Sequence, residues 1–157
     1  MIGCVTHLYV TATAAAPMEP RTEIKALADI GIEGDRYAVG AGEYSSRGGR
    51  GRHLTLIAQE AIDEANAELD SPLAPGEHRR SIVTQAVDLM SLLGRRFRIG
   101  EVECEGVRTC PPCTYLDGVV GRRVYDALTD RSGIRADITS SGIIRVGDPI
   151  ELLDAPA

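Results

Sequence analysis

The amino-acid sequence predicts a mainly β protein with a few helices (α+β), in which a mostly antiparallel sheet is rolled or closed into a barrel. Short apolar or alternating segments recur along the chain between glycine and proline turn signals. Only two stretches have helical periodicity, and strands and helices do not alternate over any long region, which argues against a parallel doubly wound sheet. For a chain of 157 residues we expect one domain over residues 1–157.

The N-terminal part of the chain contains two predicted strands and one predicted helix. Residues 2–11 are rich in β-branched and aromatic side chains, and residues 53–58 alternate between apolar and polar, so both are predicted strands. Between them, residues 29–52 are rich in glycine and form a predicted loop, whose polar tail we expect to be mobile. Apolar residues at helical spacing predict a helix over 59–69.

The middle of the chain predicts further strands and one tight turn. A turn-rich connector at 71–80 leads into a β-like segment at 81–87. Farther along, apolar residues alternate as far as Ile99 and resume out of phase at Val102. Because Gly100 lies where the phase changes, we expect a tight turn or a bulge there.

The last third of the chain begins with a predicted helix and ends in strands. After Cys113, apolar residues recur at every fourth position, at Leu116, Val120, Val124 and Leu128. Gly133 then supplies a helix stop signal. The runs IRADIT (134–139) and IIRVGDPIELL (143–153) predict strands around the turn signals SSG and GDP.

The composition argues against several classes of protein. The net charge of −6 disfavours a general nucleic-acid-binding protein, and no window approaches the roughly 18 apolar residues that cross a bilayer. The N-terminus lacks the features of a signal peptide, and four cysteines are too few for the framework of a small secreted module. We therefore expect a cytoplasmic protein with reduced thiols and with no nucleic-acid or membrane partner.

The basic residues are almost all arginine. Lys25 is the only lysine among the 17 basic residues. One explanation is the base composition of the genome; another is that several guanidinium groups bind a phosphate or another planar anion bidentately. Three clusters hold half of the arginines: RGGRGRH (47–53), HRR (78–80) and GRRFR (94–98).

The stretch GVRTCPPCTYL (106–116) places Cys110 and Cys113 between a predicted strand and a predicted helix. A helix N-terminus and the nearby Arg108 would favour the thiolate form, which is a nucleophile or a ligand for a soft metal. Three interpretations remain open from these residues alone: two buried structural thiols, a zinc site, and a dithiol redox couple. The zinc site lacks a second pair of ligands, and the long β-like region before the pair does not suit a thioredoxin-like fold.

Seven short blocks, in order along the chain, carry a family resemblance. They are GIEGDRY (31–37), HLTLI (53–57), PGEHRRSIVTQAVDL (75–89), LLGRRFRIG (92–100), VRTCPPC (107–113), GIRADI (133–138) and GIIRVGDPIEL (142–152). Together they resemble the MOSC domain, the module found at the C-terminus of molybdenum cofactor sulfurases and in molybdenum-containing amidoxime reductases. The resemblance runs from about residue 3 to residue 153 and implies a barrel-like β fold.

The resemblance also implies a site for the molybdenum cofactor (molybdopterin). By position, Cys113 corresponds to the cysteine that ligates molybdenum in the reductases and is proposed to carry sulfur in sulfurase-related members. The other implied cofactor-binding residues are Arg36, Arg79, Arg80 and Arg108 at the phosphate and pterin, Gly34 and Asp35 at the rim, Ser81 where the pattern commonly has asparagine, and Cys110 as a supporting thiol. We expect no built-in pyridoxal phosphate, haem or iron–sulfur site.

Three functional hypotheses follow. The first is a molybdenum-dependent oxidoreductase that reduces a small N-hydroxylated substrate and takes electrons from an external donor. The second is a molybdenum cofactor carrier or a sulfur-relay module with a cysteine persulfide, whose partner is a cofactor biosynthesis protein. The third is a dithiol redox protein that uses Cys110 and Cys113.

Overall fold

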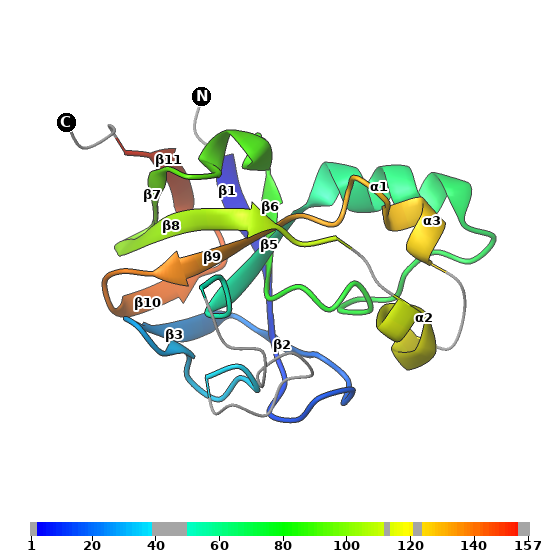
Figure 1. The fold of residues 1–157 in the computed structure, drawn as a ribbon, viewed down its shortest axis with the longest axis horizontal. Helices are drawn as coiled ribbons and strands as arrows, with labels where there is room; N and C mark the ends of the chain where they lie inside the picture. The colour runs from blue at the N-terminus through cyan, green and yellow to red at the C-terminus, as the bar shows by residue number, and fades with distance from the viewer. Residues whose placement is uncertain (1–2, 39–49, 112–113, 121–123, 154–157) are drawn as a thin grey trace.

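A computed structural model describes residues 3–38, 50–111, 114–120 and 124–153. Within these ranges the chain forms a closed seven-stranded barrel, a small second sheet and three α-helices (Figure 1), so the predicted fold class is confirmed. The strands are β1 (Gly3–Val10), β2 (Glu19–Arg21), β3 (Glu23–Leu27), β4 (Gly31–Ile32), β5 (Leu54–Ala58), β6 (Ile82–Gln85), β7 (Arg96–Ile99), β8 (Val102–Thr109), β9 (Ile134–Ile138), β10 (Gly142–Arg145) and β11 (Pro149–Leu152). The helices are α1 (Gln59–Glu68), the 3-10 helix η2 (Leu89–Leu92), α2 (Thr114–Val120) and α3 (Tyr125–Leu128).

The barrel closes because β11 pairs with both β7 and β1. The order around the ring is β11-β7-β8-β9-β5-β6-β1, and β2 extends the sheet outward from β1. Neighbouring strands are antiparallel except β5 and β6, which are parallel and joined by α1. This strand–helix–strand unit is a local exception to the predicted antiparallel arrangement, since parallel neighbours need a crossover connection.

Alternate side chains of the barrel strands fill the interior. Along β8, buried and partly exposed residues alternate from Val102 to Gly106, as expected for a strand with one face on a core. Phe97 and Ile99 of β7 are fully buried in the same core. Burial of each such side chain contributes about 2 kcal/mol of hydrophobic stabilisation. The second sheet, β10-β3-β4, adds Ile24 and Ile144 to this core.

The three α-helices α1, α2 and α3 lie to one side of the barrel (Figure 1). A second apolar cluster joins Ile57 and Val83, which belong to β5 and β6, to Ile62 of α1 and Leu128 of α3. These residues lie on the outer face of the barrel wall, because their neighbours along the strands face the interior. The barrel therefore has a core inside and another between its wall and the helices.

Two details of the predicted secondary structure were wrong. The single helix expected after Cys113 is divided into α2 and α3; residues 121–123 lie outside the described residues, and Val124 has a non-helical backbone (φ −125°, ψ −6°). No strand was predicted over residues 19–32, where β2, β3 and β4 form. These strands are short, and β3 offers only Ile24 and Ala26 as buried apolar positions.

The turn expected at Gly100 is confirmed. Gly100 and Glu101 connect β7 to β8, and Gly100 has a left-handed backbone (φ 58°). A Cβ atom at this position would lie 2.4 Å from Oδ2 of Asp148, so only glycine fits without rearrangement. No helix in the described part of the chain is long and apolar enough to cross a membrane. The loop tail expected to be mobile falls mainly on residues 39–49, outside the described residues.

Candidate functional site

The GIEGDRY block folds into a turn that is fastened to the end of β1. The carboxylate of Asp35 is buried and accepts hydrogen bonds from the backbone amides of Thr11 (3.3 Å) and Tyr37 (3.2 Å). The amide of Arg36 donates to the carbonyl of Thr11 at 2.7 Å. Asp35 therefore fixes the turn, and its short side chain suits this role because it accepts from nearby backbone donors.

The turn covers the outer face of the barrel wall where β9, β5 and β6 meet. Arg135 of β9 is the register partner of Thr55 of β5, and Ser81 immediately precedes β6. Neighbouring residues Ile134 and Ala136 face the barrel core, so Arg135 points to the opposite, outer face. Arg135 is nevertheless only 8% exposed. Tyr37 lies over it, with its ring centroid 5.8 Å from Cζ of Arg135.

Four arginines gather at this place, and we call them the arginine cluster: Arg36, Arg52, Arg79 and Arg135. The first three line one small cavity together with Asp35, Tyr37, His53, Thr55 and Ser81. Arg36 forms an ion pair with Asp35 at 3.3 Å, and its Cζ lies 4.8 Å from the centroid of the Tyr37 ring. The wall thus carries three guanidinium groups and one carboxylate. A wall rich in guanidinium donors suits an anion, which accepts charge-assisted hydrogen bonds from them.

Arg79 is held in a sparsely populated conformation. Its backbone is left-handed (φ 62°), and its amide donates to the carbonyl of Gly76 at 3.0 Å. Nη1 of the same residue donates to the carbonyl of Ala16 at 2.6 Å. Such a conformation costs about 1 kcal/mol in a residue with a side chain and persists only where the surroundings impose it, often at functional sites.

Arg80 points away from the cluster and holds the turn that carries the cysteine pair. Its guanidinium donates to the carbonyls of Ser132 (Nε, 2.8 Å) and Cys110 (Nη2, 2.9 Å). Among the described residues, no carboxylate lies within ion-pairing distance of Arg80. Arg80 is therefore bound to the polypeptide backbone between β8 and β9, where it positions the chain leading to Cys113.

The other residues implied by the resemblance have separate surroundings. The hydroxyl of Ser81 is hydrogen-bonded to the backbone of Thr55. It donates to the Thr55 carbonyl at 3.0 Å and accepts from the Thr55 amide at 2.9 Å. Gly34 is exposed, with open space around it and a left-handed backbone (φ 85°). Arg108 is exposed near the end of β8, where it is the register partner of Arg135.

The cysteine pair is described in part. Cys110 is 1% exposed; its amide donates to the carbonyl of Gly133 (2.8 Å), and its own carbonyl accepts from the hydroxyl of Ser132 (2.6 Å). Cys113 lies outside the described residues. A dithiol couple needs an accessible attacking thiol, and Cys110 is not one. Burial raises the pKa of Cys104 to about 12, so that thiol stays protonated.

His53 adds a hydrogen-bond donor to the arginine cavity. Its Nδ1 accepts from the backbone amide of Ile138 at 2.9 Å, so the neutral ring carries its proton on Nε2. The segment that contains His53 is anchored to β9, because the carboxylate of Asp137 accepts from the amide of Gly51 at 2.7 Å. In the described part of the chain, no group of three or more His, Cys, Asp or Glu residues could hold a metal ion.

The cavities near the cluster are small. The one lined by Arg36, Arg52 and Arg79 measures about 10 Å³, which admits a water-sized group. A second cavity of about 200 Å³ shares Arg79 and is otherwise lined mainly by apolar residues, including Met18 and Val119. Arg79 belongs to the lining of both cavities, and the second one also contains the carboxylate of Glu77.

Sequence reasoning missed two members of the cluster. Arg52 lies in the arginine-rich run RGGRGRH, and Arg135 lies in the block GIRADI, so both were within segments that had been singled out. The missing information was which face of each segment is covered. For Arg135, the alternation of Ile134 and Ala136 indicates an outward side chain, and only the tertiary position of Tyr37 makes that face buried.

The protein is thus a closed, mainly antiparallel barrel with an arginine cluster on its outer wall. A family model, "MOSC domain", matches residues 43–151, which is more than half of the chain. The chain therefore belongs to the MOSC family, which is associated with the molybdenum cofactor. No curated protein sequence gives a significant match.

Solved structures share the fold. The YUAD protein from Bacillus subtilis superimposes with a TM-score of 0.80 at 18% identity, over 97% of this chain and 96% of that protein. YiiM from Geobacillus stearothermophilus gives a TM-score of 0.71 at 13% identity, over 97% of this chain and 75% of YiiM. YiiM from Escherichia coli gives a TM-score of 0.69 at 17% identity, over 100% of this chain and 72% of YiiM. At these identities the likeness concerns the fold alone.

Proposed function

We propose that this MOSC protein binds the molybdenum cofactor and reduces small N-hydroxylated compounds with electrons from an external donor. The observation that carries the proposal is the buried guanidinium of Arg135 in the arginine cluster. Nη1 of Arg135 is buried and has no hydrogen-bond partner among the described residues, which leaves a charged donor for an anion. A phosphate group, as in the cofactor, accepts such charge-assisted hydrogen bonds well.

The described residues fit one end of the cofactor by their chemistry. Guanidinium groups suit its phosphate, and the cavity of about 200 Å³ that shares Arg79 adds apolar side chains and the carboxylate of Glu77 beside them. By volume the two cavities, of about 10 and about 200 Å³, are smaller than the whole cofactor requires. The proposal therefore assigns to this region only the phosphate end of the cofactor, and the cavity of about 10 Å³ would have to widen to accept a phosphate.

Each group of the chain has a distinct role in this proposal. Arg36, Arg79 and Arg135 bind and orient the phosphate, while Asp35 holds the covering turn in place. Nε2–H of His53 is a neutral donor in the same wall. Arg80 positions the chain that leads to Cys113, whose thiolate would hold the metal. When bound, the cofactor would supply a two-electron Mo(IV)/Mo(VI) couple for removal of oxygen from the substrate.

Replacement of Cys113 by serine tests the metal assignment. Protein produced in a host that makes the cofactor is expected to contain molybdenum and pterin, and Cys113→Ser is expected to lose most of the molybdenum because a hydroxyl is a poor ligand for a soft metal. Elemental analysis and pterin fluorescence measure both. Cys4→Ser, at a half-buried thiol of β1, is the matched control and should keep the metal.

Turnover separates the reductase from a carrier or sulfur-relay module. The metal-containing protein should reduce an aromatic amidoxime with an artificial reductant, and the Cys113→Ser variant should not. Retention of metal and pterin without turnover would support the carrier instead. A preparation that never contains molybdenum and forms a Cys110–Cys113 disulfide on oxidation would contradict the proposal and favour the dithiol protein.

Replacement of Arg135 by glutamine tests the anion site. Loss of a charge-assisted hydrogen bond costs about 2 kcal/mol, so the affinity of the protein for the pterin should fall about tenfold or more. Less pterin should then remain bound after gel filtration. The measurement is pterin content as a function of free cofactor concentration. Arg98→Gln removes a partly exposed arginine that pairs with Glu151 of β11 at 3.0 Å, and it should leave pterin binding unchanged. Equal effects of the two variants would argue against the arginine cluster as the phosphate site.

A further inference from the structure

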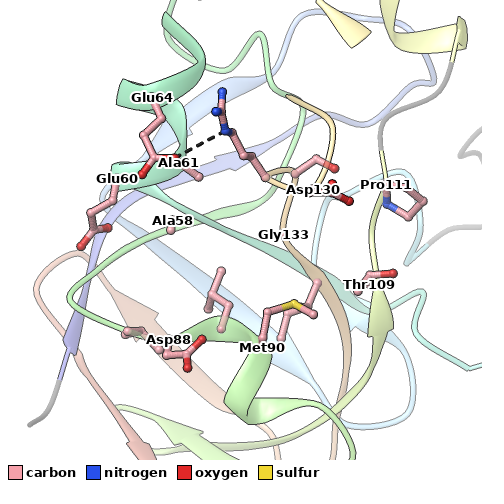
Figure 2. A pocket seen from close by; sticks show the side chains of 15 residues that line it. Ala58, Glu60, Ala61, Glu64, Asp88, Met90, Thr109, Pro111, Asp130 and Gly133 are labelled. Atoms are coloured by element: carbon pink, nitrogen blue, oxygen red, sulfur yellow. Dashed lines mark ion pairs between the residues drawn. The ribbon is translucent and has the colours of Figure 1, made fainter. Parts of the chain in front are cut away.

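A third cavity, larger than the two beside Arg79, lies away from the arginine cluster. It measures about 430 Å³ and opens between the first turns of α1, the helix η2 and the segment that leads into β9 (Figure 2). This volume is within the roughly 300–1,000 Å³ of small-molecule sites. The lining includes Ile134, Leu89 and Ala58, which give the cavity an apolar floor.

Acidic side chains surround this floor. Figure 2 shows Glu60 and Glu64 of α1 on one side, Asp88 at the start of η2 on another, and Asp130 before β9 on a third. The positively charged group in the lining is Arg131, which is already paired with Glu64 (3.4 Å) and with Glu68. The cavity thus has the opposite charge from the arginine cluster.

Two of the carboxylates are available to a ligand. Glu60 accepts a hydrogen bond from the amide of Ala86 at 2.8 Å, and Glu64 pairs with Arg131. The carboxylates of Asp88 and Asp130 form no hydrogen bond or ion pair with other described residues. Met90 borders the same opening with a side chain that is 58% exposed, and a flexible thioether adapts well to a flat apolar ligand.

We propose that this cavity binds a small organic cation with a flat apolar body, such as an aromatic amidine. The apolar floor would contact the body of the ligand, and Asp88 and Asp130 would face its charge. A metal ion fits less well, because no three acidic side chains among the described residues converge at metal-binding distances. The concave shape and the apolar floor also favour a small molecule over a basic side chain of another protein.

The cavity touches the chain that carries the cysteine pair. Thr109 and Pro111 belong to its lining, and Gly133, also in the lining, accepts the hydrogen bond of the Cys110 amide at 2.8 Å. A ligand in the cavity would therefore lie against the segment that leads to Cys113. The inference does not require the proposed cofactor, because the cavity is formed by the polypeptide alone.

Binding of benzamidine to the purified full-length protein tests the proposal. Titration by NMR or calorimetry at low salt should give saturable binding of benzamidine, with shifts at the methyl groups of Ile134 and Leu89. Benzamide, which has the same shape without the charge, should bind at least about fivefold more weakly. The double variant Asp88→Asn/Asp130→Asn should also weaken benzamidine about fivefold, because it removes two exposed charges at nearly constant shape.

The control is Asp70→Asn, which removes an exposed carboxylate after α1 and should leave the affinity unchanged. The proposal is wrong if benzamide binds as tightly as benzamidine, or if the double variant binds benzamidine like the parent protein. It is equally wrong if an oligolysine peptide saturates the protein and shifts the same methyl groups while benzamidine does not bind. That last result would identify the cavity as a docking site for a basic protein segment.

Discussion

Replacement of Arg80 by alanine is expected to destabilise the protein by about 3 kcal/mol. The buried guanidinium of Arg80 donates to the carbonyls of Ser132 and Cys110, so its removal leaves these acceptors poorly satisfied and also leaves a void. In a domain of this size the loss corresponds to a decrease of roughly 10 °C in Tm. Chemical denaturation measured by circular dichroism gives the change in free energy of unfolding directly.

The effect of the Arg80 substitution should be specific to its buried position. Arg98→Ala, at an arginine whose ion pair with Glu151 is partly open to solvent, should cost about 1 kcal/mol or less. Arg80→Lys keeps the positive charge but loses the planar guanidinium group, whose N–H donors reach both carbonyls. The stability of this variant should therefore lie between those of Arg80→Ala and the parent protein. If Arg80→Ala were no more destabilising than Arg98→Ala, the assigned role of Arg80 in holding the cysteine turn would be wrong.

The protein is also expected to lose stability as the pH falls below about 6.5, because of His78. Burial, and then the positive charges of Arg80 and His7, lower the pKa of His78 from 6.5 to about 3. Between these values the unfolded chain binds a proton that the folded protein does not, so stability decreases as the pH falls through this window. The full stability is present above pH 6.5. Below that value the free energy of unfolding decreases by roughly 1 kcal/mol per pH unit.

The variant His78→Asn should remove this slope. The amide oxygen of asparagine can replace Nδ1 of His78, which accepts from the backbone amide of Arg80 at 2.9 Å. The variant is expected to be less stable at pH 7, since it loses the edge contact with Tyr9 (ring centroids 5.4 Å apart). The decisive quantity is the change in unfolding free energy between pH 6.5 and 5, where most carboxylates remain ionised. An unchanged slope in the variant would show that another group causes the acid sensitivity.

Much of the barrel could be predicted from local patterns. The alternation in β7 and β8, broken at Gly100, predicted a tight turn or a bulge there, because the period of two and its phase shift are visible in the sequence. By contrast, β2, β3 and β4 were missed because each is short and depends on partners far along the chain; β3, for example, pairs with β10 through Ile24 and Ile144. Pairings of this kind leave little local signal.

The site was predictable in part, and for a different reason. Arg36, Arg79, Asp35 and Ser81 were implied by a family resemblance, and they line one cavity. The resemblance could not reveal that Arg80 binds backbone carbonyls, because neighbouring arginines look alike in a sequence and differ only in direction. Arg135 was missed because its burial depends on Tyr37, which is almost a hundred positions away.

The pairing of β11 with β1 has a consequence for how the chain acquires its structure. Gly3 and Ile150 are register partners, so the ring of strands is completed by contacts between residues nearly 150 positions apart. During synthesis, β1 and β7 present unsatisfied edges until the segment Pro149–Leu152 has emerged. Loss of that short segment would leave two exposed edges able to recruit strands from other molecules, and so would favour aggregation over a smaller stable fold.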